Sequence, residues 1–254
     1  MLFSVRQELY KLVRRKIFWV APIVMFVLMI VLGYTVGVEE TKFLSVSCFG
    51  FSEVSPLILI IVGSTLFSME FQNNTILTLL YKAKSKIYVY LSKFFVIFMY
   101  DVFLHILAIV FTLILRSVIL KQVPSWTMIY EYHQPLWQNM LIATLIDLIF
   151  TLLVISTLFL LSSAISNNAL VLCLSIAVIF FGKYVSVQLM RIKDFIHILR
   201  WNPFNMANLV GQYYHYDEYS RMSHLSVFQL SAGSLIYIAL FLGVGYLIFT
   251  KKRF

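Results

Sequence analysis

The stretch that decides the fold is residues 17–38, IFWVAPIVMFVLMIVLGYTVGV, which holds 22 positions without a charged side chain. About 20 apolar residues in a helix cross the roughly 30 Å hydrocarbon core of a bilayer, so this stretch predicts a membrane span. Pro22 falls in its first turns, where a helix needs no amide donor. Basic residues precede the span within residues 1–16 and no small-residue cleavage site follows it, so we expect an uncleaved anchor rather than a signal peptide.

The same apolar character runs through all 254 residues. Hydrophobic side chains make up 61% and charged side chains 12% of the chain, against about 45–50% and 25% in soluble proteins. This composition excludes a soluble enzyme. A net charge of +9 fits Lys and Arg held on the cytoplasmic side of a membrane, and we expect no nucleic-acid partner. The two cysteines, Cys48 and Cys173, have no ligand-like spacing and indicate neither a disulfide framework nor a metal site.

Five further apolar stretches predict five more spans. The second span is interrupted only by Glu53 and is bent or begun by Pro56, and a polar stretch at 162–168 divides the uncharged residues 148–182 between the fourth and fifth spans. No strand alternation is visible, so we expect an all-α membrane protein forming a single transmembrane domain over residues 1–254. The six expected transmembrane helices cover residues 17–38, 51–69, 94–115, 139–161, 169–186 and 225–250.

The distribution of basic residues predicts the orientation of the chain. If the N-terminus is inside the cell, the segments 1–16, 70–93, 162–168 and 251–254 are cytoplasmic and together hold 12 of the 20 Lys and Arg residues. This bias follows the positive-inside rule. We therefore expect a multi-pass protein of the cell membrane with both termini in the cytoplasm.

Two amphipathic segments lie outside the expected spans. Residues 1–16 place an apolar stripe beside basic side chains and predict an interfacial helix, for which a simple basic anchor on anionic lipid is the plainer interpretation. Before the sixth span, a run that stops at Asn202-Pro203-Phe204 predicts a re-entrant or surface-lying half-helix. Its apolar residues follow helical spacing and are Ile192, Phe195, Ile196 and Leu199.

The segment between the second and third spans is the most informative for function. Glu70 ends the second span, and Asn74 or Thr75 can begin a short helix that runs through Tyr81. A short helix between two spans needs membrane or protein to cover its apolar side, so we expect a docking element. Its apolar residues are Ile76, Leu77, Leu79 and Leu80, and Lys82, Lys84 and Lys86 follow them.

This progression resembles the signature of ABC-2-type transporter permeases, which show Glu, Gly-Thr, Leu-Leu, Ser-Arg and Lys in the same order. The present chain departs from it with Asn74 in place of Gly and with Lys86 in place of Arg. The resemblance implies that the segment is a coupling helix that docks on a separate ABC ATP-binding subunit. It assigns this docking to Glu70, Thr75, Leu79, Lys82 and Lys86.

The resemblance also implies a function and further partners. A permease of this kind pairs with a second permease copy or a paralogue and has short re-entrant helices before its sixth span. The chain is similar to Gram-positive permeases for bacteriocins, lantibiotics and phenol-soluble modulins. We therefore expect export of, or self-protection against, amphipathic peptides such as cytolytic toxins, with a lipid-like substrate as a further option.

The chain lacks the motif needed to hydrolyse ATP itself. Its Gly182-Lys183 pair is followed by Tyr184 rather than Ser or Thr and lies in an apolar run. We expect a transport subunit that is not an enzyme and has no cofactor of its own, with ATP and Mg²⁺ bound by the partner subunit.

Ionisable residues within the spans offer an alternative function. Asp101 and His105 lie four residues apart on one helical face and can pair, and Asp147 could meet Lys183 inside the bundle. These groups indicate either a polar clasp between helices or the site of an ATP-independent channel or proton-coupled carrier. A carrier usually shows inverted repeats or broken helices, and neither is visible in the sequence. A membrane scaffold without transport is the third option.

Overall fold

The computed structural model describes residues 2–36, 40–68, 70, 81, 85–120, 122–192 and 195–251. Within these residues the regular elements are helical, and six helices are long and apolar enough to cross a membrane. The predicted all-α membrane fold is therefore confirmed. The spans are α2 (Lys16–Val36), α3 with α4 (Thr41–Val46 and Phe51–Leu66), α7 (Lys86–Ile119), α8 (Leu136–Ala164), α9 (Asn168–Met190) and α13 (Val227–Lys251).

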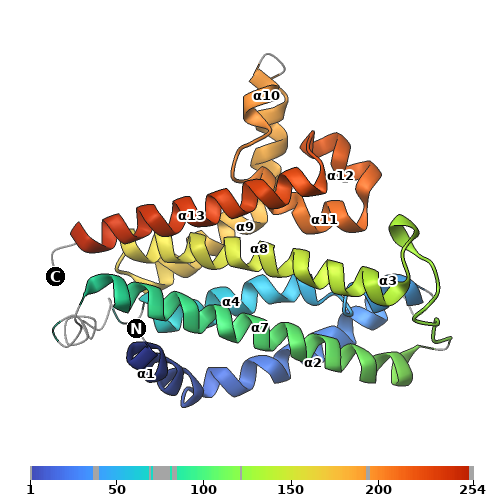
Figure 1. Cartoon of the computed structure of the whole chain (residues 1–254), viewed down its shortest axis with the longest axis horizontal. Coiled ribbons are helices and arrows are strands. Elements are labelled where there is room, and N and C mark those ends of the chain that lie inside the picture. Colours follow the sequence, from blue (N-terminus) through green and yellow to red (C-terminus); the bar gives the residue numbers. More distant parts are fainter. Residues whose placement is uncertain are drawn as a thin grey trace.

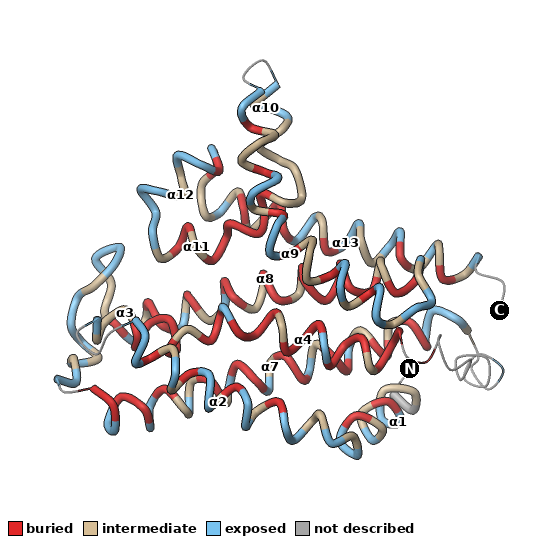
Figure 2. Tube along the Cα trace, turned by 180° about the vertical axis from the view of Figure 1, so that it is seen from behind, coloured by how far each residue is buried: buried red, intermediate tan, exposed pale blue. Residues whose placement is uncertain are grey.

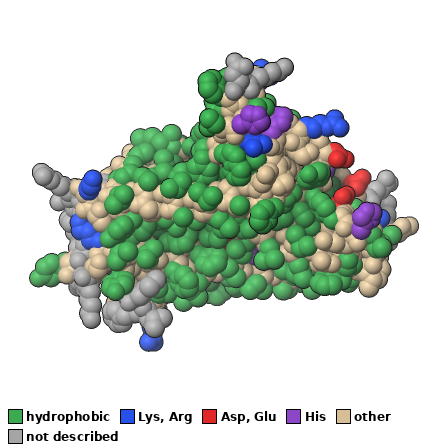
Figure 3. Space-filling view, turned by 45° about the horizontal axis from the view of Figure 1, so that its top comes forward, with side chains coloured by type: hydrophobic (Ala, Val, Ile, Leu, Met, Phe, Trp, Pro, Cys, Tyr) green, Lys and Arg blue, Asp and Glu red, His purple; other side chains and the backbone are tan. Residues whose placement is uncertain are grey.

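The bundle is organised around α8, which packs against α4, α7, α9 and α13. Both chain termini lie at one end of the bundle, here called the terminal end, and α3 lies at the other, here called the loop end (Figure 1). Burial is concentrated on α4 and α8, whereas a much smaller share of α2, α9 and α13 is buried (Figure 2). A broad apolar surface runs between the two ends, where charged side chains gather (Figure 3). This distribution suits helices embedded in hydrocarbon.

The third and fifth spans extend further than the apolar stretches alone indicated. Helix α7 begins at Lys86 rather than near residue 94, directly after Ser85, whose extended backbone occupies the N-cap position. Its 34 residues correspond to about 50 Å of helix, more than the bilayer core requires. Helix α9 likewise continues to Met190 instead of ending at 186. Apolar composition marks the part of a helix that lies in hydrocarbon, whereas the helix itself continues into the interface.

The second span is a broken helix, which was not visible in the sequence. Three consecutive residues between α3 and α4 have left-handed backbone, with φ of 48° at Cys48, 52° at Phe49 and 75° at Gly50. Gly50 adopts this conformation without a Cβ penalty, whereas the other two do so only within tight packing, and both are buried. Pro56 does not begin the helix, as was one expectation, because α4 begins at Phe51 and Pro56 lies inside it.

The segment before the sixth span folds back onto the bundle as a series of short helices. The expected half-helix is reduced to α10 (Ile196–Leu199), which stands out from the bundle beyond α9 (Figure 1). Ile192 and Phe195 of the expected apolar stripe are exposed. The chain then returns through η3 (Asn205–Asn208), α11 (Leu209–Tyr214) and α12 (Tyr216–Ser223), while η1 (Glu131–His133) lies in the loop before α8.

Buried amide side chains hold this returning segment in place. Asn205 donates to the carbonyl oxygens of Arg200 at 2.6 Å and Ser223 at 2.9 Å. The amide of Gln212 donates to the carbonyl oxygen of Leu225 at 2.6 Å. Because these amides satisfy backbone groups that no helix ladder pairs, the irregular segment can be buried at low cost.

Candidate functional site

Four charged residues from three parts of the chain meet at the terminal end of the bundle, and we call them the ion cluster: Glu8, Lys11, Glu70 and Lys93. The Lys93 ammonium lies 2.8 Å from a carboxylate oxygen of Glu8 and 2.5 Å from one of Glu70. Lys11 lies 2.7 Å from Glu8 and 3.2 Å from Glu70. Each ammonium therefore contacts both carboxylates, and the four formal charges cancel.

The amphipathic pattern of α1 (Leu2–Val13) explains how Glu8 reaches this position. Glu8 lies one helical turn before Leu12, and both are buried where α1 packs on α7. Val5 and Leu9 pack against the same core. The apolar side of α1 is therefore held by the bundle and not only by a membrane surface, and it brings an acidic residue with it.

Burial makes the ion cluster strongly interdependent. Lys93 is fully buried and Glu8 is 3% exposed, so an uncompensated charge at either position would be costly. Burial alone would raise the pKa of Glu8, but the nearby Lys93 and Lys11 ammonium groups outweigh it and lower that pKa. Burial would lower the pKa of Lys11, but Glu8 and Glu70 raise it. The described geometry therefore favours the fully ionised state of these two groups.

Two basic side chains also bind the last carbonyl groups of α4. Arg15 donates to the carbonyl oxygen of Thr65 at 2.5 Å, and Lys93 donates to that of Leu66 at 3.2 Å. The final carbonyls of a helix lack partners within the helix and carry partial negative charge, so cations stabilise them. The end of α4, just before Glu70, is thus bound to the turn between α1 and α2 and to α7.

The residues expected to dock a partner fall partly within this arrangement. Glu70 belongs to the ion cluster, and Lys86 donates to the carbonyl oxygen of Thr250 near the end of α13 at 3.0 Å. The other three expected docking residues, Thr75, Leu79 and Lys82, lie outside the described residues. The segment that contains them starts and ends at residues tied to the terminal end of the bundle.

Three members of the ion cluster, Glu8, Lys11 and Lys93, were given no role in the sequence analysis, although the Lys that opens the third span belongs to the permease signature. Glu8 is the only acidic residue before Glu39 in the sequence, and this isolation could have marked it as a candidate. Lys93 lies directly before the apolar run of α7, and charges are tolerated least within such a run. Pairing between residues 85 positions apart is not encoded in any local pattern.

A second polar site, the Asp–His–Asp cluster, consists of Asp101, His105 and Asp147 within the spans. The structure brings Asp101 and His105 together as expected, with Nδ1 of His105 3.1 Å from Oδ1 of Asp101. Nε2 of His105 lies 3.2 Å from Oδ2 of Asp147. Thr151 donates to Asp101 at 2.7 Å and Ser55 donates to Asp147 at 3.3 Å. The cluster therefore joins α4, α7 and α8 at depth.

The Asp–His–Asp cluster is closed off from the surface. Its three ionisable residues are at most 2% exposed. With a carboxylate at each ring nitrogen, a protonated His105 would donate on both sides and bridge Asp101 to Asp147. The break in the second span lies next to it, since the ring of Phe51 packs edge-on against His105 at 4.9 Å between centroids.

Lys183 does not join this cluster, so the expected meeting with Asp147 is wrong. Lys183 instead lines a small cavity between α4 and α9, together with Glu53 and Pro56. Asp147 is paired with His105 and Ser55 instead. Helical spacing alone does not determine which neighbouring helix a long Lys side chain faces.

Two comparisons with known proteins bear on these sites. A family model described as ABC-2 family transporter protein matches residues 4–182. The match covers about 70% of the chain and includes every residue of the ion cluster and of the Asp–His–Asp cluster. The comparison with curated proteins gives no significant match.

Proposed function

The chain belongs to the ABC-2 family of transporter proteins, and we propose that it is the permease subunit of an ABC exporter driven by a separate ATP-binding subunit. Six membrane-crossing helices make it a multi-pass membrane protein. In this proposal the ATP-binding subunit docks on the segment between α4 and α7, through Glu70, Thr75, Leu79, Lys82 and Lys86. ATP and Mg²⁺ are bound by that partner.

The ion cluster is the single observation that supports this proposal most. It ties the start of the docking segment, at Glu70, to α1 and to α7 through buried charges. A force applied to the segment would therefore move α1, the end of α4 and α7 together. Buried ion pairs resist separation, because removing one partner leaves the other charge uncompensated.

Helix α7 provides a continuous route from the docking segment into the bundle. It runs without interruption from Lys86 past Lys93 to Asp101 and His105. Lys93 and Asp101 are separated by about 12 Å of helix. Tilting of α7 would thus act directly on the Asp–His–Asp cluster, which joins α7 to α4 and α8.

The remaining features of the proposal rest on the family resemblance and the charge distribution. The terminal end faces the cytoplasm, so that both termini and the turn at 165–167 lie on the side of the ATP-binding subunit. A second permease copy or paralogue completes the transporter. Amphipathic peptides, such as bacteriocins or cytolytic toxins, are the proposed cargo, and the apolar spans rich in Phe and Met are compatible with them.

A pull-down from native membranes tests the docking. The full-length wild-type chain should retain a nucleotide-binding protein, and Leu79→Asp and Lys82→Ala should lose it. Arg221→Ala is the matched control, because Arg221 is an exposed basic residue in α12 at the loop end. Equal capture by all variants would refute the docking site.

A separate experiment tests the cargo. Deletion of the permease should raise the amount of peptide retained in cells, and unchanged export and peptide resistance would refute the proposed cargo.

The broken second span beside the Asp–His–Asp cluster favours a second candidate, an ion-coupled carrier or channel. Broken helices line ion and substrate sites in many transporters. Asp101→Asn and Asp147→Asn separate the two candidates. Loss of transport with unchanged capture of the ATP-binding protein favours the carrier, whereas loss of transport only after replacement of Leu79 or Lys82 favours the ABC permease.

A further inference from the structure

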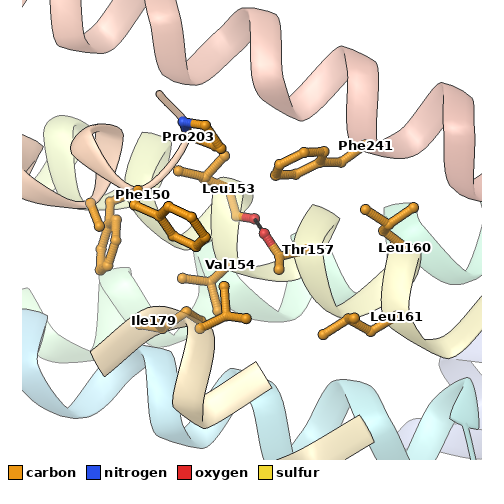
Figure 4. A pocket seen from close by; sticks show the side chains of 12 residues that line it. Phe150, Leu153, Val154, Thr157, Leu160, Leu161, Ile179, Pro203 and Phe241 are labelled. Atoms are coloured by element: carbon orange, nitrogen blue, oxygen red, sulfur yellow. Dashed lines mark hydrogen bonds between the residues drawn. The ribbon is translucent and has the colours of Figure 1, made fainter. Parts of the chain in front are cut away.

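An apolar cavity of about 200 Å³ lies within the spans, apart from both charged clusters. It is bounded by α8, α9 and α13 and by the turn that leads into η3 (Figure 4). The labelled side chains converge on one space from these four elements. The lining consists of Phe150, Leu153, Val154, Thr157, Leu160, Leu161, Val178, Ile179, Pro203, Phe204, Ala207 and Phe241.

The cavity forms because a turn of the chain holds α9 and α13 apart. The turn at 203–207 packs between them, because Phe204 lies against Gly182 of α9 and Met206 lies against Gly233 of α13. A Cβ at Gly182 would come within 2.9 Å of the Phe204 ring. The cavity begins below this turn and extends along α8 toward Leu160 and Leu161, near the terminal end.

The lining chemistry excludes most classes of ligand. Thr157 provides the only side-chain oxygen among the lining residues, all of which the structure describes, and its hydroxyl already donates to the carbonyl oxygen of Leu153 at 2.8 Å. Water needs several polar partners to occupy a cavity. A peptide main chain would bring amide and carbonyl groups that find no partner here, which is costly away from water. A hydrocarbon chain has no such requirement.

The surroundings supply hydrocarbon directly. Apolar residues that neighbour the lining residues in sequence are exposed, with Phe180 beside Ile179 on α9 at 45% exposure and Leu240 beside Phe241 on α13 at 51%. In a membrane these faces contact lipid acyl chains. An engineered apolar cavity of about 150 Å³ remains dry and takes up benzene, so a space of this size suits a short stretch of acyl chain.

We propose that this cavity is a binding site for one acyl chain of a membrane phospholipid, inserted between α9 and α13 below the turn at 203–207. The chain fills space that would otherwise leave its lining without packing partners. It thereby supports the returning segment before the sixth span. This site is independent of the ATP-binding partner and of the exported cargo.

Photo-cross-linking in liposomes tests the site. The full-length protein is reconstituted in phosphatidylcholine that carries a diazirine on one acyl chain, irradiated, and mapped by mass spectrometry. We expect adducts on lining residues such as Leu161 and Phe241. Ala207→Leu and Thr157→Met each place extra atoms in the cavity and should lower these adducts roughly tenfold, which corresponds to about 1.4 kcal/mol of binding free energy.

Ala239→Leu is the matched control, because Ala239 lies on the exposed face of α13 and the change adds the same atoms. Its cavity adducts should equal those of the wild type. The proposal is overturned by a wild type without adducts on the lining, or by equal adducts in both filled variants. Labelling of the lining by a diazirine-bearing amphipathic peptide, or by a second copy of the chain, in place of the lipid would also overturn it.

Discussion

The buried charged residues of the two clusters lie where opposite charges meet them. Lys93 is fully buried and is paired with both Glu8 and Glu70, and His105 lies between two carboxylates. Burial of an isolated charge is prohibitively costly, whereas a hydrogen-bonded group of charges can be accommodated. Replacing one member should therefore have a larger effect than its single contact suggests.

Lys93→Met tests this interdependence. It leaves Glu8 and Glu70 buried with Lys11 as their remaining ammonium partner, so we expect a loss of about 3–5 kcal/mol of unfolding free energy. Lys86→Met is the control, because Lys86 is exposed and binds one backbone carbonyl. Thermal unfolding of both variants in detergent measures the difference. Equal midpoints would show that the ion cluster contributes nothing.

The ion cluster should also set the pH range over which the fold is most stable. The pKa of Glu8 is lowered from its ordinary 4.5, so its stabilisation is present above that value and is lost as the pH falls through the lower folded pKa. The pKa of Lys11 is raised above 10.5, so its stabilisation is present below that value and is lost as the pH rises further. We expect Glu8→Gln to remove part of the acid-side decline in melting temperature. An unchanged acid limb would contradict this assignment.

Where α13 packs against α7 and α8, close approach of the backbones decides the fit. At Gly245 of α13, an added Cβ would lie 2.5 Å from the Tyr90 hydroxyl and 3.3 Å from the Leu160 backbone. At Gly243, two residues earlier, an added Cβ would meet nothing within 4 Å. The two glycines lie in the same helix and differ in whether a neighbouring helix leaves room for a side chain.

Alanine substitutions at the two glycines should consequently have opposite effects. Gly245→Ala forces α13 away from α8 and should destabilise the protein by about 1–3 kcal/mol. Gly243→Ala should stabilise it by about 0.5–1 kcal/mol, because alanine favours helix over glycine. Thermal unfolding in the same detergent compares them. A destabilised Gly243→Ala or a neutral Gly245→Ala would show that α13 packs differently.

Among the buried amides that hold the returning segment before α13, that of Asn205 should matter strongly. Asn205 is fully buried and its amide group donates to two carbonyl oxygens. Asn205→Asp keeps the shape but removes both donors, and we expect a loss of roughly 2–4 kcal/mol. Limited proteolysis should then cut within residues 196–223 faster than in the wild type. Unchanged proteolysis would mean that other contacts hold the segment.

Spans are predictable from sequence because they need only length and apolar composition, as the six membrane-crossing helices demonstrate. The break at Cys48–Gly50 was missed because its residues are small or apolar and resemble any buried helix. The spacing of Ile192 and Phe195 predicted an amphipathic half-helix, but both side chains are exposed and α10 has four residues. Contacts between distant residues, such as Glu8 with Lys93, depend on packing that no local pattern specifies.

In the whole molecule, an apolar middle separates two ends of different character (Figure 3). The terminal end gathers α1, the ends of α4 and α13, and the start of α7, and basic side chains bind the last carbonyls of α4 and α13. The loop end holds the short helices that return onto α8. An ATP-binding subunit that acts at the terminal end would transmit movement to the interior of the bundle through α7, which connects the ion cluster to the Asp–His–Asp cluster.

Cysteine cross-linking in native membranes tests the central claim most directly, namely that a separate ATP-binding subunit docks between α4 and α7. In a Cys173→Ser background, a short bifunctional thiol–amine reagent is applied to Lys82→Cys and, as control, to Arg221→Cys at the loop end. The account predicts that Lys82→Cys forms an adduct with a nucleotide-binding protein, in an amount that changes when ATP is added, and that Arg221→Cys forms none. Failure of Lys82→Cys to capture such a protein, or equal capture by Arg221→Cys, would contradict the account.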